Sequence, residues 1–285
     1  CGIRARTMRL IEIGIDPPGT PIVRSFLVVG ETGAGKTVLV ASFPRVYWIG
    51  SEREDGAEAI KYMDRALWYE RDRPPIARAV KTIADVDACL KEAVMLVEKG
   101  VVRTIALELS CYSDDVVRSS EGDARSKYGT LEQHMTVLDS RLKAIPSTIV
   151  AYNALPDRRN PEVTLPLIAG RALGPRLPAV VSAYVYLRTE SVGERLDRVL
   201  HLAPYGTVTC RHRYGSRLPA VLRNPTYRII EDVIAGRLVV DSVGNAIPLG
   251  APVLPPPPPL DGGGNGAGVG AVLGTLPAID VLPTI

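Results

Sequence analysis

Hydrophobic residues follow two patterns along the chain, and the balance between them changes near its middle. In the first half, short apolar runs alternate with longer amphipathic stretches, whereas in the second half apolar runs follow one another. Residues 82–98 illustrate the amphipathic pattern, because Ile83, Val86, Leu90 and Val94 recur at spacings of three and four, as in a helix. Helices are predicted at residues 36–43, 82–98 and 131–145. Strands are predicted at residues 9–15, 25–30, 46–50, 103–109, 147–153, 179–188, 197–203 and 207–213.

This order of elements predicts an α/β fold. Alternating strands and helices indicate a mostly parallel central sheet flanked by helices, and the later strands indicate antiparallel additions toward the C-terminus. Ligands of such sheets bind at the carboxyl ends of the strands. The polar residues that end each predicted strand are therefore the first candidates for a functional site.

The composition predicts one folded core with a tail. We expect an N-terminal strand segment at residues 1–24, a core at residues 25–240 and a flexible tail at residues 241–285. The tail contains five consecutive prolines and then a glycine-rich stretch, a composition typical of a spacer that does not pack into a core.

The first strong chemical signal is "GETGAGKT" at residues 30–37, which matches the pattern G-x-x-x-x-G-K-[ST]. An apolar run precedes it and a predicted helix follows it, the context in which a P-loop cradles phosphates with its backbone N–H groups. A glycine-rich turn without a ligand is the other interpretation. We expect ATP and Mg²⁺ as cofactors, with Thr37 as a metal ligand. The residues expected to bind the nucleotide are Gly30, Glu31, Thr32, Gly33, Ala34, Gly35, Lys36, Thr37 and Val38.

Four further strand ends carry residues suited to phosphate chemistry. Glu52 or Glu54 is able to orient an attacking water, and Glu108 stands where a P-loop ATPase usually places an acid that holds the Mg²⁺ shell. Asn153 is able to hydrogen-bond the γ-phosphate. The last predicted strand ends in Arg211 and Arg213, whose charge is suited to neutralising phosphate. Solvated surface residues are the alternative interpretation at each position.

Charge is unevenly distributed along the chain. Residues 1–150 carry 21 basic and 21 acidic side chains, residues 151–240 carry 13 arginines against 7 acids, and residues 241–285 carry three aspartates and no basic residue. An arginine-rich segment beside a nucleotide site favours polyanion binding over a merely solvated surface. The four cysteines lack metal or disulfide spacing, and no apolar run is long enough to span a membrane.

Beyond the P-loop, several segments resemble the RecA-like phage ATPases of the Sak type, which act in single-strand annealing or recombination. The resemblance covers residues 8–236. It rests on "SFP" after the P-loop helix, "VYWIGSE", "SKYG", "LPLIAGRALGPRLPAVVSAYVYLR" and "TVTCRHRYGSRLPAVLRNPTYRIIEDV".

This resemblance implies a RecA-like core and a set of roles. It implies that Glu52 is the catalytic glutamate and that Asn153 is the γ-phosphate sensor, while the P-loop pattern itself predicts that Lys36 reaches the β- and γ-phosphates and takes part in catalysis. Arg211 with Arg213 would form a basic finger that acts across a subunit boundary. The family usually has Asp where Glu108 stands and Lys where Arg211 stands, so hydrolysis is expected to be slow.

Two polar segments are expected to bind single-stranded DNA, residues 111–130 and residues 154–176. Cations there would follow phosphates, and Tyr128 would stack on a base. Flexible surface loops are the alternative interpretation. The expected DNA contacts are Arg118, Arg125, Lys127, Tyr128, Arg158, Arg159, Arg171 and Arg176.

The sequence therefore predicts an ATP-binding and ATP-hydrolysing single-stranded DNA-binding protein of recombination, annealing or repair. ATP at a subunit interface would control its DNA affinity. The resemblance implies a homo-oligomer or filament, a single-strand-binding or recombination protein as a further partner, no membrane association, and action in the cytoplasm of a phage-infected bacterium. The alternatives are a nucleic-acid-independent P-loop enzyme, such as a small-molecule kinase, and a nucleotide-gated module that barely turns over.

Overall fold

The structure, a computed structural model, describes residues 24–51, 59–80, 82–109, 113–114, 117–118, 120–145, 148–168 and 173–249. The chain divides into two compact units, Cys1–Ala251 and Pro252–Ile285, and all described residues belong to the first. The predicted strand at residues 9–15 lies outside the described residues, as does most of the predicted tail.

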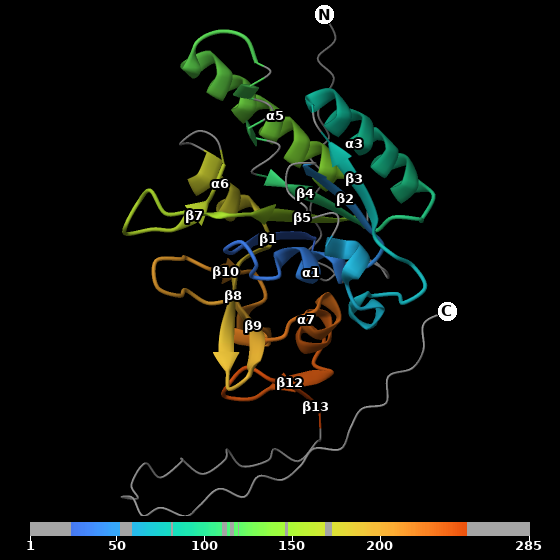
Figure 1. Ribbon diagram of the computed structural model, residues 1–285, viewed down its shortest axis with the longest axis vertical. Helices are drawn as coiled ribbons and strands as arrows, with labels where there is room; N and C mark the ends of the chain where they lie inside the picture. Colours follow the sequence, from blue (N-terminus) through green and yellow to red (C-terminus); the bar gives the residue numbers. More distant parts are fainter. Residues whose placement is uncertain are drawn as a thin grey trace, which may run out of the picture. The chain divides into compact units, whose positions relative to one another are not determined.

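A mostly parallel sheet forms the centre of the first unit (Figure 1). Its parallel strands are β1 (Ser25–Val29), β2 (Val46–Ser51), β3 (Ile76–Val80), β4 (Thr104–Glu108), β5 (Ile149–Ala154) and the start of β8 (Ala183–Val192). Antiparallel strands extend it as β9 (Arg195–His201), β10 (Arg211–His212) and β11 (Val221–Arg223). The order is β11-β9-β8-β1-β5-β4-β2-β3, with β10 paired to β8. The predicted α/β class with C-terminal antiparallel strands is confirmed.

Helices cover both faces of this sheet, and this explains why the central strands are mostly apolar. Figure 1 shows α3 (Ile83–Glu98) and α5 (Ala124–Ala144) on one face, with α1 (Lys36–Ala41) and α7 (Tyr227–Ile234) on the other. Every residue of β1, β4 and β5 is buried, as expected for strands covered on both sides. The helix α6 (Leu173–Val180) packs with α3 and α5 against the same core cluster.

The second long helix begins earlier than the sequence predicts. Asp123 accepts a hydrogen bond from the backbone N–H of Ser126 and caps α5, which starts at Ala124 rather than residue 131. Arg125, Lys127 and Tyr128 therefore lie on the first turns of a helix and not in a loop.

Smaller elements complete the unit. They are the 3-10 turns at Ile60–Tyr62, Arg65–Leu67 and Gly215–Arg217, the pair β6 (Pro156–Asp157) with β7 (Leu165–Pro166), and the hairpin of β12 (Leu238–Val240) with β13 (Ala246–Pro248). The boundary predicted at residue 240 falls inside this last hairpin. The helices α6 and α7 were not predicted from the sequence, and the strand predicted at residues 207–213 is reduced to β10.

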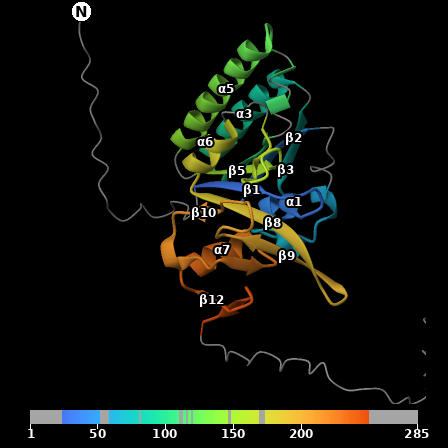
Figure 2. The same ribbon diagram turned by 90° about the vertical axis from the view of Figure 1, so that its left-hand side faces the viewer.

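The hairpin of β8 and β9 extends past the end of β1. The last pair between β1 and β8 joins Val29 to Tyr186, whereas β8 continues to Val192 and pairs with β9 along that extension. Figure 2 shows the hairpin projecting beyond the neighbouring strands. The extension therefore passes beside the loop that follows β1.

Charged and aromatic side chains tie this hairpin to its neighbours. Asp197, which is 1% exposed, accepts hydrogen bonds from Arg195, Arg223 and Asn224. Nearby, Nε of Arg188 donates to Nε2 of His201 at 2.9 Å, and the His201 ring stacks on Tyr205 at 3.8 Å between centroids.

The buried His201 predicts a loss of stability in mild acid. Burial, and secondarily the Arg188 guanidinium, lowers the pKa of His201 from 6.5 to about 4. A histidine with a depressed folded-state pKa contributes stability that is lost as pH falls from the unfolded value toward the folded one. We expect the free energy of unfolding to fall by about 2 kcal/mol between about pH 8 and about pH 5 from this residue. Urea denaturation across this range would measure it.

The matched variant is His201→Gln, whose side-chain oxygen can still accept the hydrogen bond from Arg188. Its pH profile should be flatter than that of the wild-type protein between those two values. Equal slopes for the two proteins would show that His201 is not the titrating group.

Candidate functional site

The segment between β1 and α1 has the backbone of a phosphate-binding loop. Gly33 and Gly35 have φ angles of 80° and 84°, in the left-handed region that favours glycine. The N–H of Ala34 donates to the carbonyl of Glu31 at 3.1 Å, which closes the turn. The loop begins where β1 meets β5, since the N–H of Gly30 donates to the carbonyl of Ala154 at 3.3 Å.

Lys36 points back across this loop. Its ammonium group donates to the carbonyl oxygens of Gly30 at 2.9 Å and of Glu31 at 3.0 Å. Both acceptors are neutral backbone groups at the start of the loop. A phosphate entering the loop would therefore offer this ammonium a charged acceptor, and charge-assisted hydrogen bonds are the stronger kind.

The β8–β9 hairpin packs directly on the loop. A Cβ atom on Gly30 would stand 2.3 Å from the carbonyl oxygen of Leu187, and one on Gly35 would stand 2.7 Å from Cδ of Arg198. Gly30 needs glycine because the close atom belongs to the backbone, whereas Gly35 needs it because of its positive φ, since the Arg198 side chain could shift.

Glu108 and Asn153 end adjacent strands beside the loop. They are paired in the register of β4 with β5, and Asn153 is also paired with Val28 of β1. Two residues earlier on each strand, Ala106 and Ala151 belong to the core cluster that includes α1, so Glu108 and Asn153 face the same side of the sheet.

Both of these polar side chains are buried. Glu108 is 7% exposed and Asn153 is 2% exposed, and Nδ2 of Asn153 lies 3.5 Å from Oε1 of Glu108. The other amide atom of Asn153, Oδ1, is buried and has no hydrogen-bond partner among the residues that the structure describes. A buried polar atom without a partner is costly, and such atoms are frequent at sites that a ligand completes.

Other predicted catalytic residues lie elsewhere. Glu52 and Glu54 fall outside the described residues. Arg211 is paired with Tyr184, and the N–H of Arg213 donates to the carbonyl of Ser182. Ser182 is level with Ser25 at the start of β1, and Tyr184 is level with Leu27 at its middle. The backbone of Arg213 therefore lies level with the end of β1 that is opposite the loop at residues 30–37, and the backbone of Arg211 lies level with the middle of this strand.

Most of the predicted nucleic-acid residues that the structure describes lie on α5, beside β6 and on α6. Arg118 and Arg125 are exposed, Lys127 is half-buried, Tyr128 is 44% exposed, and Arg171 lies outside the described residues. The remaining three form ion pairs on the surface: Arg158 with Glu31 of the loop, Arg159 with Asp157, and Arg176 with Glu132 of α5.

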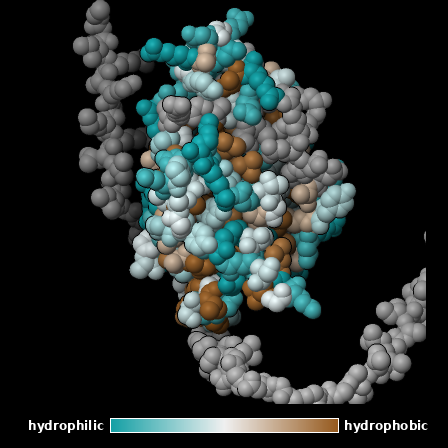
Figure 3. Space-filling model, turned by 60° about the vertical axis from the view of Figure 1, so that its left-hand side comes forward, coloured by the Kyte–Doolittle hydropathy of each residue, from teal (hydrophilic) through white to brown (hydrophobic). Residues whose placement is uncertain are grey.

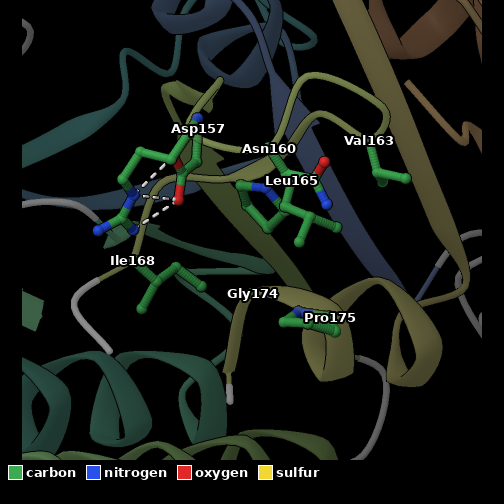
Figure 4. A pocket seen from close by; sticks show the side chains of 9 residues that line it. Asp157, Asn160, Val163, Leu165, Ile168, Gly174 and Pro175 are labelled. Atoms are coloured by element: carbon green, nitrogen blue, oxygen red, sulfur yellow. Dashed lines mark hydrogen bonds and ion pairs between the residues drawn. The ribbon is translucent and has the colours of Figure 1, made fainter. Parts of the chain in front are cut away.

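The segment around β6 and β7 borders two surface cavities. One, of about 380 Å³, is lined by Asp157, Arg159, Leu165, Ile168 and Pro175, and Figure 4 shows the Asp157 carboxylate bridged to the adjacent guanidinium. The other, of about 440 Å³, is lined by Arg158, Tyr186 and Tyr205 among others. Figure 3 brings the side of β7, β8 and β10 forward and shows hydrophobic patches scattered among hydrophilic side chains.

Arg198 is a residue of this site that the sequence interpretation missed. A usable signal was present, because Arg198, Leu200 and Leu202 share one face of an alternating strand, and Leu200 and Leu202 are buried. A cation on an apolar face of a strand is unusual. Only the long-range pairing of the hairpin with β1 brings Arg198 to the loop.

Comparisons with known proteins do not assign the chain to a family. No protein-family model matches the chain, and no curated protein matches it either. Among the described residues, no helix is long and apolar enough to cross a membrane.

The described residues also contain no cluster of three or more His, Cys, Asp or Glu suited to a metal ion. A phosphate-bound Mg²⁺ does not require such a cluster, since one or two protein oxygens together with phosphate oxygens and water hold it. Thr37 and Glu108 are the right kind of ligand, and the glycine backbone with Lys36 is the right kind of phosphate cradle. The residues present therefore fit a magnesium nucleotide.

Proposed function

We propose that this chain binds ATP with Mg²⁺ at residues 30–37, hydrolyses it, and uses it to control binding to single-stranded DNA. The observation that carries the nucleotide site is the complete P-loop at the end of a central buried strand, next to the buried pair of Glu108 and Asn153. A RecA-like core of the Sak type is part of the same proposal, supported by the sequence resemblance and compatible with the parallel sheet.

Each part of the site has a distinct role in this proposal. The backbone around Gly33 and Gly35 would donate N–H groups to phosphate oxygens, and Lys36 would exchange its carbonyl acceptors for phosphate. Thr37 and, through water, Glu108 would hold Mg²⁺, which neutralises phosphate charge. Asn153 would hydrogen-bond the terminal phosphate, and Glu52 would orient the attacking water.

An oligomer or filament is part of the same proposal. Arg211 and Arg213 pair with residues level with the middle and the start of β1, away from their own loop, which is compatible with a role at the nucleotide of a neighbouring copy. The exposed cations on α5 and the paired arginines around β6 would contact DNA. Surface ion pairs of this kind contribute little stability, so their arginines can exchange a carboxylate for a phosphate.

The test is the rate of phosphate release from ATP with Mg²⁺, with and without single-stranded DNA, using Lys36→Ala as the blank. We expect slow release that DNA stimulates, and DNA affinity that falls steeply with added salt. ATP-dependent DNA binding without stimulation would favour a nucleotide-gated module. Hydrolysis without any DNA binding would instead favour a nucleic-acid-independent enzyme such as a kinase, and no release above the blank would contradict the ATPase proposal.

A further inference from the structure

Arg198, which contacts the P-loop at Gly35, lies on a different face of the hairpin from its charged neighbours. Arg198 lies on the face of β9 that also carries Leu200 and Leu202, whereas Arg195 and Asp197 lie on the opposite face. Its stem contacts the loop residue that precedes Lys36. From the position of a Cβ on Gly35, Cδ of Arg198 is 2.7 Å away, Cγ is 3.4 Å and Nε is 3.9 Å.

The other arginines of this region have acidic partners. Arg188 and Arg223 pair with Glu190, and Arg195 pairs with Asp197. In contrast, the Arg198 guanidinium makes no hydrogen bond or ion pair with any described residue. It is half-buried, and this burial lowers the pKa of Arg198 from its usual value. A partly desolvated cation without a counter-charge is unfavourable in the protein by itself.

The backbone at this position is held firmly. The N–H of Arg198 donates to Oδ1 of Asn224 at 3.0 Å, and its carbonyl accepts from the N–H of Asn224 at 2.6 Å. Asn224 in turn donates from Nδ2 to the buried Asp197 at 2.9 Å. The network fixes the strand at the loop while the guanidinium has no partner among the described residues, which is the arrangement expected of a preorganised anion contact.

We propose that Arg198 is part of the nucleotide site, where its guanidinium binds a phosphate of the nucleotide held by residues 30–37 of the same chain. This inference rests on the proposed function, and it adds a cation from the β8–β9 hairpin to the loop's own Lys36. A phosphate would supply the missing counter-charge, and its geometry suits a guanidinium fork. Arg198 thereby differs from Arg211 and Arg213, whose proposed role is at the nucleotide of a neighbouring copy.

The test uses Arg198→Met, which keeps a stem to pack on Gly35 and removes the charge. Isothermal titration of the full chain with magnesium ATP should show binding weakened by about tenfold or more, the usual effect of losing a charged hydrogen bond. Inorganic tripolyphosphate should lose a similar factor, because the contact is with phosphate and not with the base. Without nucleotide, the melting temperature should be no lower than that of the wild-type protein.

The matched control is Arg237→Met, which removes an equal charge from an exposed arginine that pairs with Asp232, outside the network of Asp197 and Asn224. It should leave ATP affinity within about twofold, because an exposed charge is screened. Arg198→Lys keeps the charge but lacks the guanidinium fork, so its ATP affinity should lie between those of Arg198→Met and the wild-type protein. It also serves as the decisive variant if the Met variant melts early.

The possible failures are distinguishable. ATP binding by Arg198→Met at wild-type strength, with Lys36→Ala unable to bind, would overturn the role of Arg198 and leave the proposed function standing. Arg198→Lys as weak as Arg198→Met, or a loss for ATP without one for tripolyphosphate, would also overturn it. A wild-type chain that binds neither ATP nor tripolyphosphate would overturn both proposals.

Discussion

Replacing Gly30 with alanine is expected to destabilise the fold and to abolish nucleotide binding. The added Cβ would stand 2.3 Å from the carbonyl oxygen of Leu187 and 3.3 Å from its carbonyl carbon. These are backbone atoms of a buried strand, so no side-chain rotation relieves the clash. Either β8 must move away from β1 or the loop must leave its place at the end of β1.

The stability effect should be that of an overpacked core, about 1–3 kcal/mol. For a domain of this size that corresponds to a fall of several degrees in melting temperature, which calorimetry would measure. The same displacement shifts the N–H groups that would face phosphate, so ATP titration of the folded variant should give no detectable heat.

Gly129→Ala is the matched control for this substitution. Gly129 lies within α5, and a Cβ there would meet nothing within 4 Å. Alanine should stabilise the helix by about 0.5–1 kcal/mol and leave ATP binding unchanged. If Gly30→Ala has the same melting temperature and the same ATP affinity as the wild-type protein, the hairpin does not press on the loop as the structure describes.

The central strands were predictable because burial on both faces makes most of their positions apolar. The start of α3 was predictable for a local reason, since Thr82 and Asp85 form a capping box with hydrogen bonds of 3.2 and 2.9 Å. Such signals depend on residues a few positions apart. They can therefore be recognised in the sequence without any knowledge of the tertiary structure.

The missed helices show where local rules fail. Pro178 lies inside α6, and proline normally ends a helix, yet Leu177 and Pro178 are buried in this segment. Tertiary packing decided the conformation there. The first turns of α5 carry polar residues without apolar periodicity, so only the cap at Asp123 marked the helix start.

The candidate site also has one part that was predictable from the sequence and one part that was not. The loop at residues 30–37 was predictable because its phosphate-binding motif consists of consecutive residues. The approach of Leu187 and Arg198 to Gly30 and Gly35 was not, since it depends on strands more than a hundred residues away in sequence pairing in one sheet.

Replacing Glu108 with glutamine is expected to reduce ATP hydrolysis by about 100-fold, the usual order for removing one charged group that stabilises a transition state. This prediction belongs to the proposed function. The amide keeps the shape of the side chain and an oxygen for Asn153, whose Nδ2 lies 3.5 Å from Oε1 of Glu108, so the fold should persist. What is lost is the negative charge that would hold the water shell of Mg²⁺.

Titrations with and without Mg²⁺ separate this role from a structural one. ATP binding without the metal should be unchanged in Glu108→Gln, while the gain in affinity on adding Mg²⁺ should be smaller than in the wild-type protein. Glu98→Gln, at an exposed position on α3, controls for the loss of one negative charge. Glu108→Asp should keep metal-dependent hydrolysis, since it retains the carboxylate. Hydrolysis by Glu108→Gln at the wild-type rate would mean that the buried acid at the end of β4 serves the fold, and that another oxygen ligand holds the metal.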